Sequence, residues 1–292
     1  VVAIANLIGQ NAAGSVYYNG SYSGVPAGSS PVYLPSFVYK YYGWNSLISV
    51  QNTGTGPANV TVNFTCLNGA TASLSKNNVA KGAAVHFDLE TTSPAGLPPG
   101  GCGGSAVITS TQPVVVVDNQ SAASGLTQSF NTFDSGANKV YVPALYTKYY
   151  GWDSSLSIGK IGTGTSSVTV TYSDGGTSTC SLSDSTPSCL LYMPAVHPNT
   201  GAYAATIEAT GQPVVAIANA ANPSNQAQTY GGFSSGAGTV GLPTVMKQYY
   251  GWDTAFTCQN IGTVATSLNI LYQGYAGNAY NTGTLQPGAS VQ

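Results

Sequence analysis

The feature that most constrains the fold of this chain is a unit of about a hundred residues that occurs three times. Each copy contains the tetrapeptide Tyr-Tyr-Gly-Trp, within "VYLPSFVYKYYGWNSLISVQNTGTG", "VYVPALYTKYYGWDSSLSIGKIGTG" and "VGLPTVMKQYYGWDTAFTCQNIGTV". The tetrapeptides end at three tryptophans spaced by 108 and 100 residues: Trp44, Trp152 and Trp252. A unit of this length has the size of one β-sandwich domain and is too long for one coil of a solenoid.

Within each unit, hydrophobic residues alternate with polar ones, which is typical of half-buried antiparallel strands. In the first unit, "ANVTVNF" places Val60, Val62 and Phe64 on one face, and Asn59 and Asn63 on the solvent face. The other units repeat this pattern at Val168-Val170-Tyr172 and Leu268-Ile270-Tyr272. Helical periodicity is not sustained, so the predicted fold is all-β, with tandem immunoglobulin-like antiparallel β-sandwich domains.

The hexapeptide "VVAIAN" occurs at residues 1–6 and again at 214–219, where it follows a Gln-Pro turn and closes the second unit. The alignment divides the chain into an N-terminal donor strand with a linker, two complete units and an incomplete third unit: 1–31, 32–139, 140–239 and 240–292. The third unit lacks its last two strands, which leaves an open sheet edge.

Two explanations of this order remain open. In the first, the N-terminal strand of one molecule completes the third unit of the next, so that copies join head to tail in a filament. The donor strand is then Val1, Val2, Ala3, Ile4, Ala5 and Asn6, with Val2 and Ile4 inserted against Phe256, Leu268 and Ile270. Because two strands are missing, "SVYYNGSY" at residues 15–22 is a candidate for the second. In the second explanation, the 292 residues are a window of a longer tandem array.

The cysteines pair naturally within units. Cys66 and Cys102 fall in the first unit, and Cys180 and Cys189 in the second, which predicts two disulfides and an oxidising, extracellular compartment. Cys258 occupies the position of an apolar residue in the other units and is interpreted as a buried thiol. Four Asn-x-Ser/Thr sequons are candidate glycosylation sites: Asn19, Asn59, Asn63 and Asn119.

Charge is scarce, at 7 Lys+Arg against 9 Asp+Glu, with no arginine at all. A nucleic-acid partner needs a basic face, and an anionic membrane surface needs one too, so both are excluded as expected partners. No apolar run reaches the 18 residues of a membrane-spanning helix. A surface with so little charge is poorly soluble unless glycans or assembly cover it.

The Tyr-Tyr-Gly-Trp motif has two interpretations. Exposed aromatic rings can stack on sugars, which would make the chain an adhesin or carbohydrate-binding module. Alternatively, glycine forms a bend at a strand start and tryptophan enters the core. Its recurrence at one position of every unit favours the structural role. The polar residue after each tryptophan is expected to cap the bend: Asn45, Asp153 and Asp253.

Catalytic and metal-binding patterns are weak. His86 and His197 occupy non-equivalent positions and belong to no Ser-His-Asp or HExxH pattern. "GFSSG" at residues 232–236 lies in a linker, without the strand and helix of a nucleophile elbow. Asp88 and Glu90 are interpreted as a solvated pair at a strand end. We therefore expect no enzyme, no cofactor and no bound metal.

The order Tyr-Tyr-Gly-Trp-(Asn/Asp), Gln-Asn-x-Gly, Val-Thr-Val and "GSAVITSTQPVVVV" resembles the tandem domains of large secreted bacterial cell-surface proteins. The resemblance covers nearly the whole chain and is most complete over residues 32–119. It implies an extracellular, repetitive, structural protein and supplies no catalytic residue. The predicted function is therefore a subunit of an extracellular filament whose partners are copies of itself, with glycans or other cells as further candidates.

Overall fold

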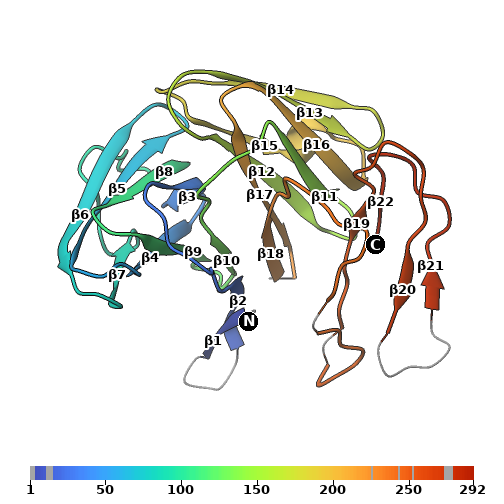
Figure 1. The fold of residues 1–292 in the computed structure, drawn as a ribbon, viewed down its shortest axis with the longest axis horizontal. Coiled ribbons are helices and arrows are strands. Elements are labelled where there is room, and N and C mark those ends of the chain that lie inside the picture. The colour runs from blue at the N-terminus through green and yellow to red at the C-terminus, as the bar shows by residue number, and fades with distance from the viewer. Residues whose placement is uncertain (1–3, 11–15, 225, 243, 252, 273–278) are drawn as a thin grey trace.

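The computed structural model describes residues 4–10, 16–224, 226–242, 244–251, 253–272 and 279–292. Figure 1 shows two β-sandwiches side by side, with residues 240–292 beyond the second one. The helix found among these residues is the four-residue α1 (Met193–Val196). An all-β, sandwich-type fold is confirmed, and its immunoglobulin-like character stays a prediction.

The first unit consists of two four-stranded antiparallel sheets, with strand orders β3–β8–β5–β6 and β10–β9–β4–β7. Their bounds are β3 (Val32–Tyr39), β4 (Trp44–Asn52), β5 (Ala58–Cys66), β6 (Thr71–Val79), β7 (Ala84–Asp88), β8 (Cys102–Ser110), β9 (Val114–Ala122) and β10 (Thr127–Asn131). In β5, Val60, Val62 and Phe64 are at most 1% exposed, whereas Asn59 and Asn63 are exposed. The alternation predicted for this segment is confirmed.

The second unit repeats the arrangement, with strand orders β11–β16–β13–β14 and β15–β12–β17–β18. Its strands are β11 (Lys139–Thr147), β12 (Asp153–Lys160), β13 (Ser166–Tyr172), β14 (Thr177–Leu182), β15 (Ser188–Tyr192), β16 (Gly201–Gly211), β17 (Val214–Asn222) and β18 (Gln226–Gly231). The inward residues of β13, Val168, Val170 and Tyr172, are again buried.

Each four-stranded sheet has two inner strands with a partner on both sides, and the one later in the sequence is termed its central strand. β8 pairs with β3 and β5, and β9 pairs with β4 and β10. In the second unit, β16 and β17 have the same role. Removing either central strand would leave unpaired backbone groups on two neighbours.

Both predicted disulfides are present. Cys66–Cys102 joins the neighbouring strands β5 and β8 within one sheet, across a sequence separation of 36 residues. Cys180–Cys189 joins β14 to β15 and so connects the two sheets of the second unit. The same cysteine count therefore crosslinks the two units in different ways.

The two sandwiches share packing at their junction. Ile217, on β17 of the second unit, is 1% exposed and belongs to the hydrophobic core of the first unit. Gly159, on β12, lies so close to Pro35 of β3 that an added Cβ would be 3.0 Å from the Pro35 Cβ. These contacts fix the second unit against the first through apolar surface rather than through a flexible linker.

The third unit is open. Its described strands are short and pair only in two couples, β19 (Cys258–Gln259) with β22 (Ser290–Val291) and β20 (Asn269–Leu271) with β21 (Ala279–Asn281). By position, they correspond to the pairs β4–β7 and β5–β6 of the first unit. The counterparts of β8 and β9, the central strands, lie outside residues 240–292. For this reason, the described strands of residues 240–292 form only the counterparts of the pairs β4–β7 and β5–β6.

At the other end, β1 (Ile4–Gln10) and β2 (Val16–Ser23) form an antiparallel hairpin. Ile4, Ala5 and Asn6 pair with Ser23, Tyr22 and Ser21 of their own chain. The expectation of a lone donor strand followed by a linker at 7–31 is therefore corrected for these residues. Val1, Val2 and Ala3 lie outside the described residues. The strand suggested at residues 15–22 is present as β2.

We expect the same truncation to affect the second and third units differently. Leu156→Ala removes a side chain that is 0% exposed and should cost about 2–5 kcal/mol of the stability of the second unit. Phe256→Ala, at the equivalent position, removes a partly exposed side chain and should cost much less. Hydrogen exchange followed by mass spectrometry reports each unit separately. Equal losses in the two units would contradict an open third unit.

Candidate functional site

In the first two units, the Tyr-Tyr-Gly-Trp motif forms a two-residue turn that leads into a strand. In the first unit, Tyr41 and Trp44 exchange two backbone hydrogen bonds of 3.1 and 3.0 Å. The two residues between them have positive φ, 50° at Tyr42 and 81° at Gly43, which is the geometry of a type I′ hairpin turn. Glycine adopts this conformation freely, whereas tyrosine does so at a cost in free energy.

The predicted cap of this turn is confirmed in all three units. The side-chain oxygen of Asn45 accepts a 2.9 Å hydrogen bond from the backbone N–H of Lys40. Asp153 accepts the same bond from Lys148, and Asp253 from Gln248, both at 2.8 Å. The residue before the two tyrosines also has positive φ in each unit, so the cap stabilises a backbone that is otherwise strained.

The interpretation of the tryptophans as core residues is wrong for those that the structure describes. Trp44 and Trp152 are only partly buried and belong to neither hydrophobic core. Trp44 lines the space between the first and second units, and the Trp152 ring lies 6.4 Å from that of Tyr146 between centroids. Trp252 lies outside the described residues.

The second tyrosine of the motif is the most exposed aromatic residue of its unit. Tyr42, Tyr150 and Tyr250 are 87%, 87% and 86% exposed, and each makes an edge-to-face contact with the tyrosine before it at 4.7 Å between ring centroids. A tyrosine with positive φ and a solvent-exposed ring contributes little to the stability of the fold. Its recurrence points to a use outside the core.

Both histidines contact neighbouring polar side chains. Nε2 of His197 lies 2.9 Å from Asp174 Oδ2, and the ring packs between Tyr172 and Tyr203, so it pins a loop. His86 is exposed, and its Nδ1 lies 3.0 Å from Ser49 Oγ on the neighbouring strand. Asp88 caps a turn by accepting hydrogen bonds from Glu90 N and Thr91 Oγ1. Among the described residues, no three potential ligands gather into a metal site.

The remaining candidate residues are placed as follows. The sequon residues Asn59 and Asn63 are exposed on β5, and Asn119 is half-buried on β9. The fourth sequon residue, Asn19, is part of strand β2. The Cys258 thiol is only partly buried, unlike its counterparts Val50 and Ile158, and desolvation raises its pKa. It therefore remains a free thiol on an incompletely covered strand.

A buried polar network, which sequence reasoning missed, lies in the first unit. Asp118 on β9 is fully buried, and its Oδ2 accepts hydrogen bonds from Ser46 Oγ and Gln120 Nε2, both 2.9 Å long. Its Oδ1 has no hydrogen-bond partner among the described residues. Burial away from any cation raises the pKa of Asp118 to about 7. The second unit has Ala218 and Ala220 at the equivalent positions, so the network belongs to the first unit alone.

The open face of the third unit contains the predicted acceptor residues. Phe256, Leu268 and Ile270 are partly exposed, although their counterparts in the other units are at most 2% exposed. Of the fifteen large hydrophobic side chains found exposed among the described residues, nine lie in residues 240–292. β19 and β20, each paired on one side, thus border an apolar surface that in the other units is covered by the central strands.

The N-terminal hairpin corresponds to the hairpin that closes each complete unit. The fourth residue of "VVAIAN" and of its counterparts is paired with the next strand in each case: Ile4 with Ser23, Val117 with Asn131, and Ile217 with Gly231. The hairpin β1–β2 is therefore the counterpart of β9–β10 and β17–β18, with a larger sequence separation between its paired residues.

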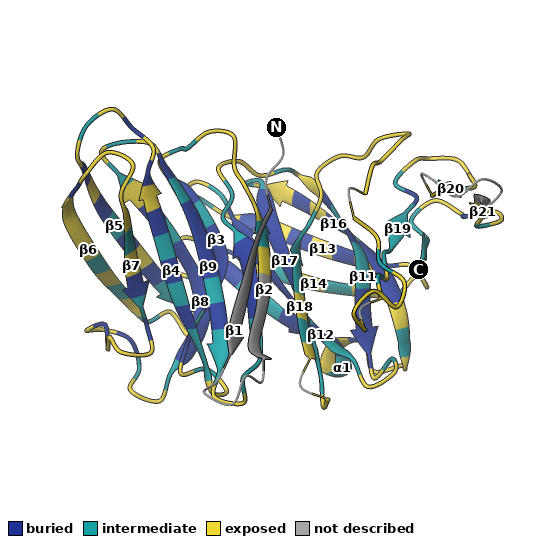
Figure 2. Ribbon diagram, turned by 90° about the horizontal axis from the view of Figure 1, so that it is seen from below, coloured by how far each residue is buried: buried dark blue, intermediate teal, exposed yellow. Residues whose placement is uncertain are grey.

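The hairpins also stack in one direction. β10 lies beside β18 of the next unit, and β2 lies beside β10, where Asn131 Nδ2 donates a 2.9 Å hydrogen bond to the Ser23 carbonyl oxygen. Figure 1 shows β2 close to β10, and Figure 2 shows β9 of the first sandwich and β17 of the second on either side of their junction. The hairpin β1–β2 thus stands before the first unit as the hairpin β9–β10 stands before the second.

Comparison with known proteins gives no further assignment: no family model, no curated protein and no solved structure matches this chain. Among the described residues, no helix is long and apolar enough to cross a membrane.

We expect Tyr42→Asn to leave the first unit at least as stable as it is now. Asparagine tolerates positive φ better than tyrosine, and a ring that is 87% exposed contributes little burial. Gly43→Ala, by contrast, should destabilise the unit by about 1 kcal/mol because alanine resists a φ of 81°. Urea unfolding followed by tryptophan fluorescence would measure both, and a loss on Tyr42→Asn that matches that of Gly43→Ala would contradict the assignment.

The stability of the first unit should fall as pH rises from about 4 to about 7. The folded chain retains a proton on Asp118 that the unfolded chain, with a pKa of 3.8, releases. The full effect is on the order of 4 kcal/mol and is complete above the folded pKa. Asp118→Asn keeps an acceptor for Ser46 and Gln120 and should remove this pH dependence. Identical pH profiles for the two proteins in urea unfolding would show that Asp118 is not the group responsible.

Proposed function

We propose that this chain is a non-catalytic, extracellular structural protein that assembles head to tail. The hairpin β1–β2 of one copy pairs with the open third unit of the next. The observation that carries this proposal is that the equivalent segments at residues 1–6, 114–119 and 214–219 each lead an antiparallel hairpin, β1–β2, β9–β10 and β17–β18, whereas the described part of residues 240–292 contains no such hairpin.

Docking of the hairpin would cover one of the two open sheets. In the complete units, the first strand of the hairpin pairs with β4 or β12, whose counterpart in the third unit is β19. The favourable free energy of docking would come from burial of the apolar surface around Phe256 and from backbone hydrogen bonds between strands, which contribute about 1 kcal/mol each. The counterpart of β8 is not supplied by the hairpin, so the other sheet keeps one open position.

The direction of stacking supports a continuous row. Because β2 already lies beside β10 as β10 lies beside β18, a third unit completed by β1–β2 would precede the first unit of the next copy. The junction between copies would then match the junction between the two sandwiches of one chain. This is a heterologous, non-closing contact, which generates filaments rather than closed dimers.

The extracellular location is supported by the two disulfides, which persist in oxidising compartments. The exposed sequon residues Asn59 and Asn63 are open to glycosylation. Glycans on this face would compensate for the scarcity of surface charge, without covering the open face of the third unit.

The native free thiol provides a test of register. Ile158 pairs with Ala216, so by equivalence Cys258 should lie opposite Ala3 of the docked hairpin. Directly opposed strand residues have a Cα separation of about 4.5–5.5 Å, which a disulfide can span. Ala3→Cys should therefore give a ladder of disulfide-linked multimers under mild oxidation, resolved on a non-reducing gel.

Matched variants sharpen the test. Ile217, the counterpart of Ile4, points out of its own sandwich, whereas Ala216, the counterpart of Ala3, lies in its core. Ala3, rather than Val2 and Ile4 as expected from the sequence, would therefore face the interior of the third unit. Ile4→Cys places the thiol on the opposite face of the strand and should give no ladder. Ala3→Cys combined with Cys258→Ser should also run as a monomer on the non-reducing gel, because no disulfide can form between the copies. The proposal fails if Ala3→Cys yields only monomers and closed dimers, or if Ile4→Cys crosslinks equally well. In that case, completion of the third unit by further residues of a longer array would be the better account.

A further inference from the structure

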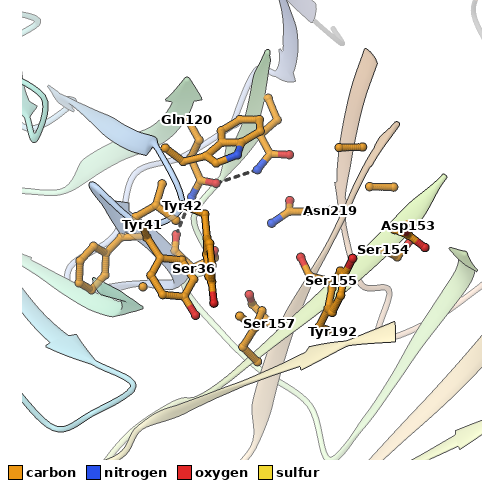
Figure 3. Close-up of a pocket in the computed structure, with 18 of the residues that line it drawn as sticks. Ser36, Tyr41, Tyr42, Gln120, Asp153, Ser154, Ser155, Ser157, Tyr192 and Asn219 are labelled. Atoms are coloured by element: carbon orange, nitrogen blue, oxygen red, sulfur yellow. Dashed lines mark hydrogen bonds between the residues drawn. The ribbon is translucent and has the colours of Figure 1, made fainter. Parts of the chain in front are cut away.

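A cavity of about 660 Å³ lies between the first and second sandwiches. One side is formed by the Tyr-Tyr-Gly-Trp turn and β3 of the first unit. The other side is formed by β12, β15 and β17 of the second unit. Figure 3 shows Tyr41 and Tyr42 facing Ser155, Asn219 and Tyr192 across the opening. The cavity therefore exists only where two units meet, and it has the size of a small-ligand site.

The lining combines aromatic rings with uncharged polar groups. Tyr41, Tyr42 and Trp44 provide the rings, and serine, asparagine and glutamine side chains provide donors and acceptors. No lysine lines the cavity, and the chain has no arginine. Asp153 is the one carboxylate among the described lining residues, and its Oδ1 is already used by the Lys148 N–H. An acidic ligand would find no counter-charge here, and a purely apolar one would leave the polar groups unsatisfied.

One polar group of the lining is buried and unused. Ser188 on β15 is 6% exposed, and its Oγ has no hydrogen-bond partner among the described residues. A buried hydroxyl without a hydrogen-bond partner destabilises the fold, and a hydrogen bond to a ligand hydroxyl would remove this penalty. Tyr42 is also energetically unfavourable in the free protein. It has positive φ, and its ring is 87% exposed at the edge of the same cavity.

The wall on the side of the first unit is rigid. Gln128 Nε2 donates a 2.8 Å hydrogen bond to Gln120 Oε1, and Gln120 Nε2 donates to the Ser36 carbonyl oxygen and to buried Asp118. Ser36, Gln120 and Gln128 all line the cavity. The buried network thus presents fixed amide groups to whatever occupies the space.

The next junction contains a reduced version of the same cavity. It measures about 290 Å³ and is lined by Pro143, Ala144 and Tyr149, the counterparts of Pro35, Ser36 and Tyr41, and by Ser290 of β22. Tyr150, the counterpart of Tyr42, does not line it. Ala220 takes the place of Gln120, so the aromatic edge and the amide wall are specific to the first junction.

We propose that the cavity between the first and second units binds an uncharged saccharide. Sugar rings have apolar C–H faces that pack on aromatic rings and hydroxyl edges that hydrogen-bond to serine and amide groups, which is the combination the lining offers. Tyr42 stacks on the sugar, and Ser188 receives one of its hydroxyl groups. The site lies within one chain and does not depend on head-to-tail assembly.

The test is isothermal titration calorimetry of the full chain with cellohexaose, xylohexaose, mannohexaose and chitohexaose, with hexagalacturonate as the acidic comparison. At least one neutral sugar should bind, and Tyr42→Asn, which suits the turn, should weaken it about tenfold or more. Tyr150→Asn makes the same change at a tyrosine that lines neither cavity, although Tyr149 and Gly151 of its turn do, and should leave affinity unchanged. Ser188→Ala should weaken binding while leaving the fold at least as stable.

Three results would overturn the proposal: no heat of binding with any neutral sugar at millimolar concentration, preferential binding of hexagalacturonate, or equal effects of Tyr42→Asn and Tyr150→Asn. The Cys258→Ser variant, which cannot form the crosslink used to test assembly, should bind the sugar as the unaltered chain does. Loss of sugar binding and loss of assembly are therefore distinguishable.

Discussion

The pairing of two central strands with neighbours on both sides is the constraint on which this molecule depends. β8 and β9 in the first unit, and β16 and β17 in the second, each satisfy the backbone groups of two other strands. Where their counterparts are absent from residues 240–292, the side chains of Phe256, Leu268 and Ile270 become partly exposed and only outer strand pairs form. The open third unit and the complete units follow from the same rule of hydrogen-bond satisfaction.

Local features could be predicted from the sequence because their causes are local. Strict alternation in "ANVTVNF" identified the buried face of β5, and the position of Asn45 after the turn identified its cap. The disulfides followed from the placement of cysteines within units. In each case the physical reason, a two-residue period or a side chain within reach of a backbone N–H, spans only a few positions or one unit.

The features that escaped prediction depend on distant residues. Asp118 meets Ser46 across 72 residues, and the cavity unites Tyr42 with Asn219, so no short pattern reveals either one. The prediction that Trp44 and Trp152 lie in the core was wrong because a motif that recurs in every unit can form a turn as well as a core. Hairpin β1–β2 was not predicted because the separation between its paired residues differs from that in β17–β18, although the same hexapeptide position is paired in both.

The insertion of Ile217 into the core of the first sandwich has a mechanical consequence. Unfolding the second sandwich would withdraw this side chain and leave a hole in its neighbour, so the loss of one domain weakens the adjacent one. Adjacent domains under tension should therefore yield in correlated steps rather than independently. Such coupling would make the row behave as a stiff rod up to a threshold force, and then extend abruptly over more than one domain.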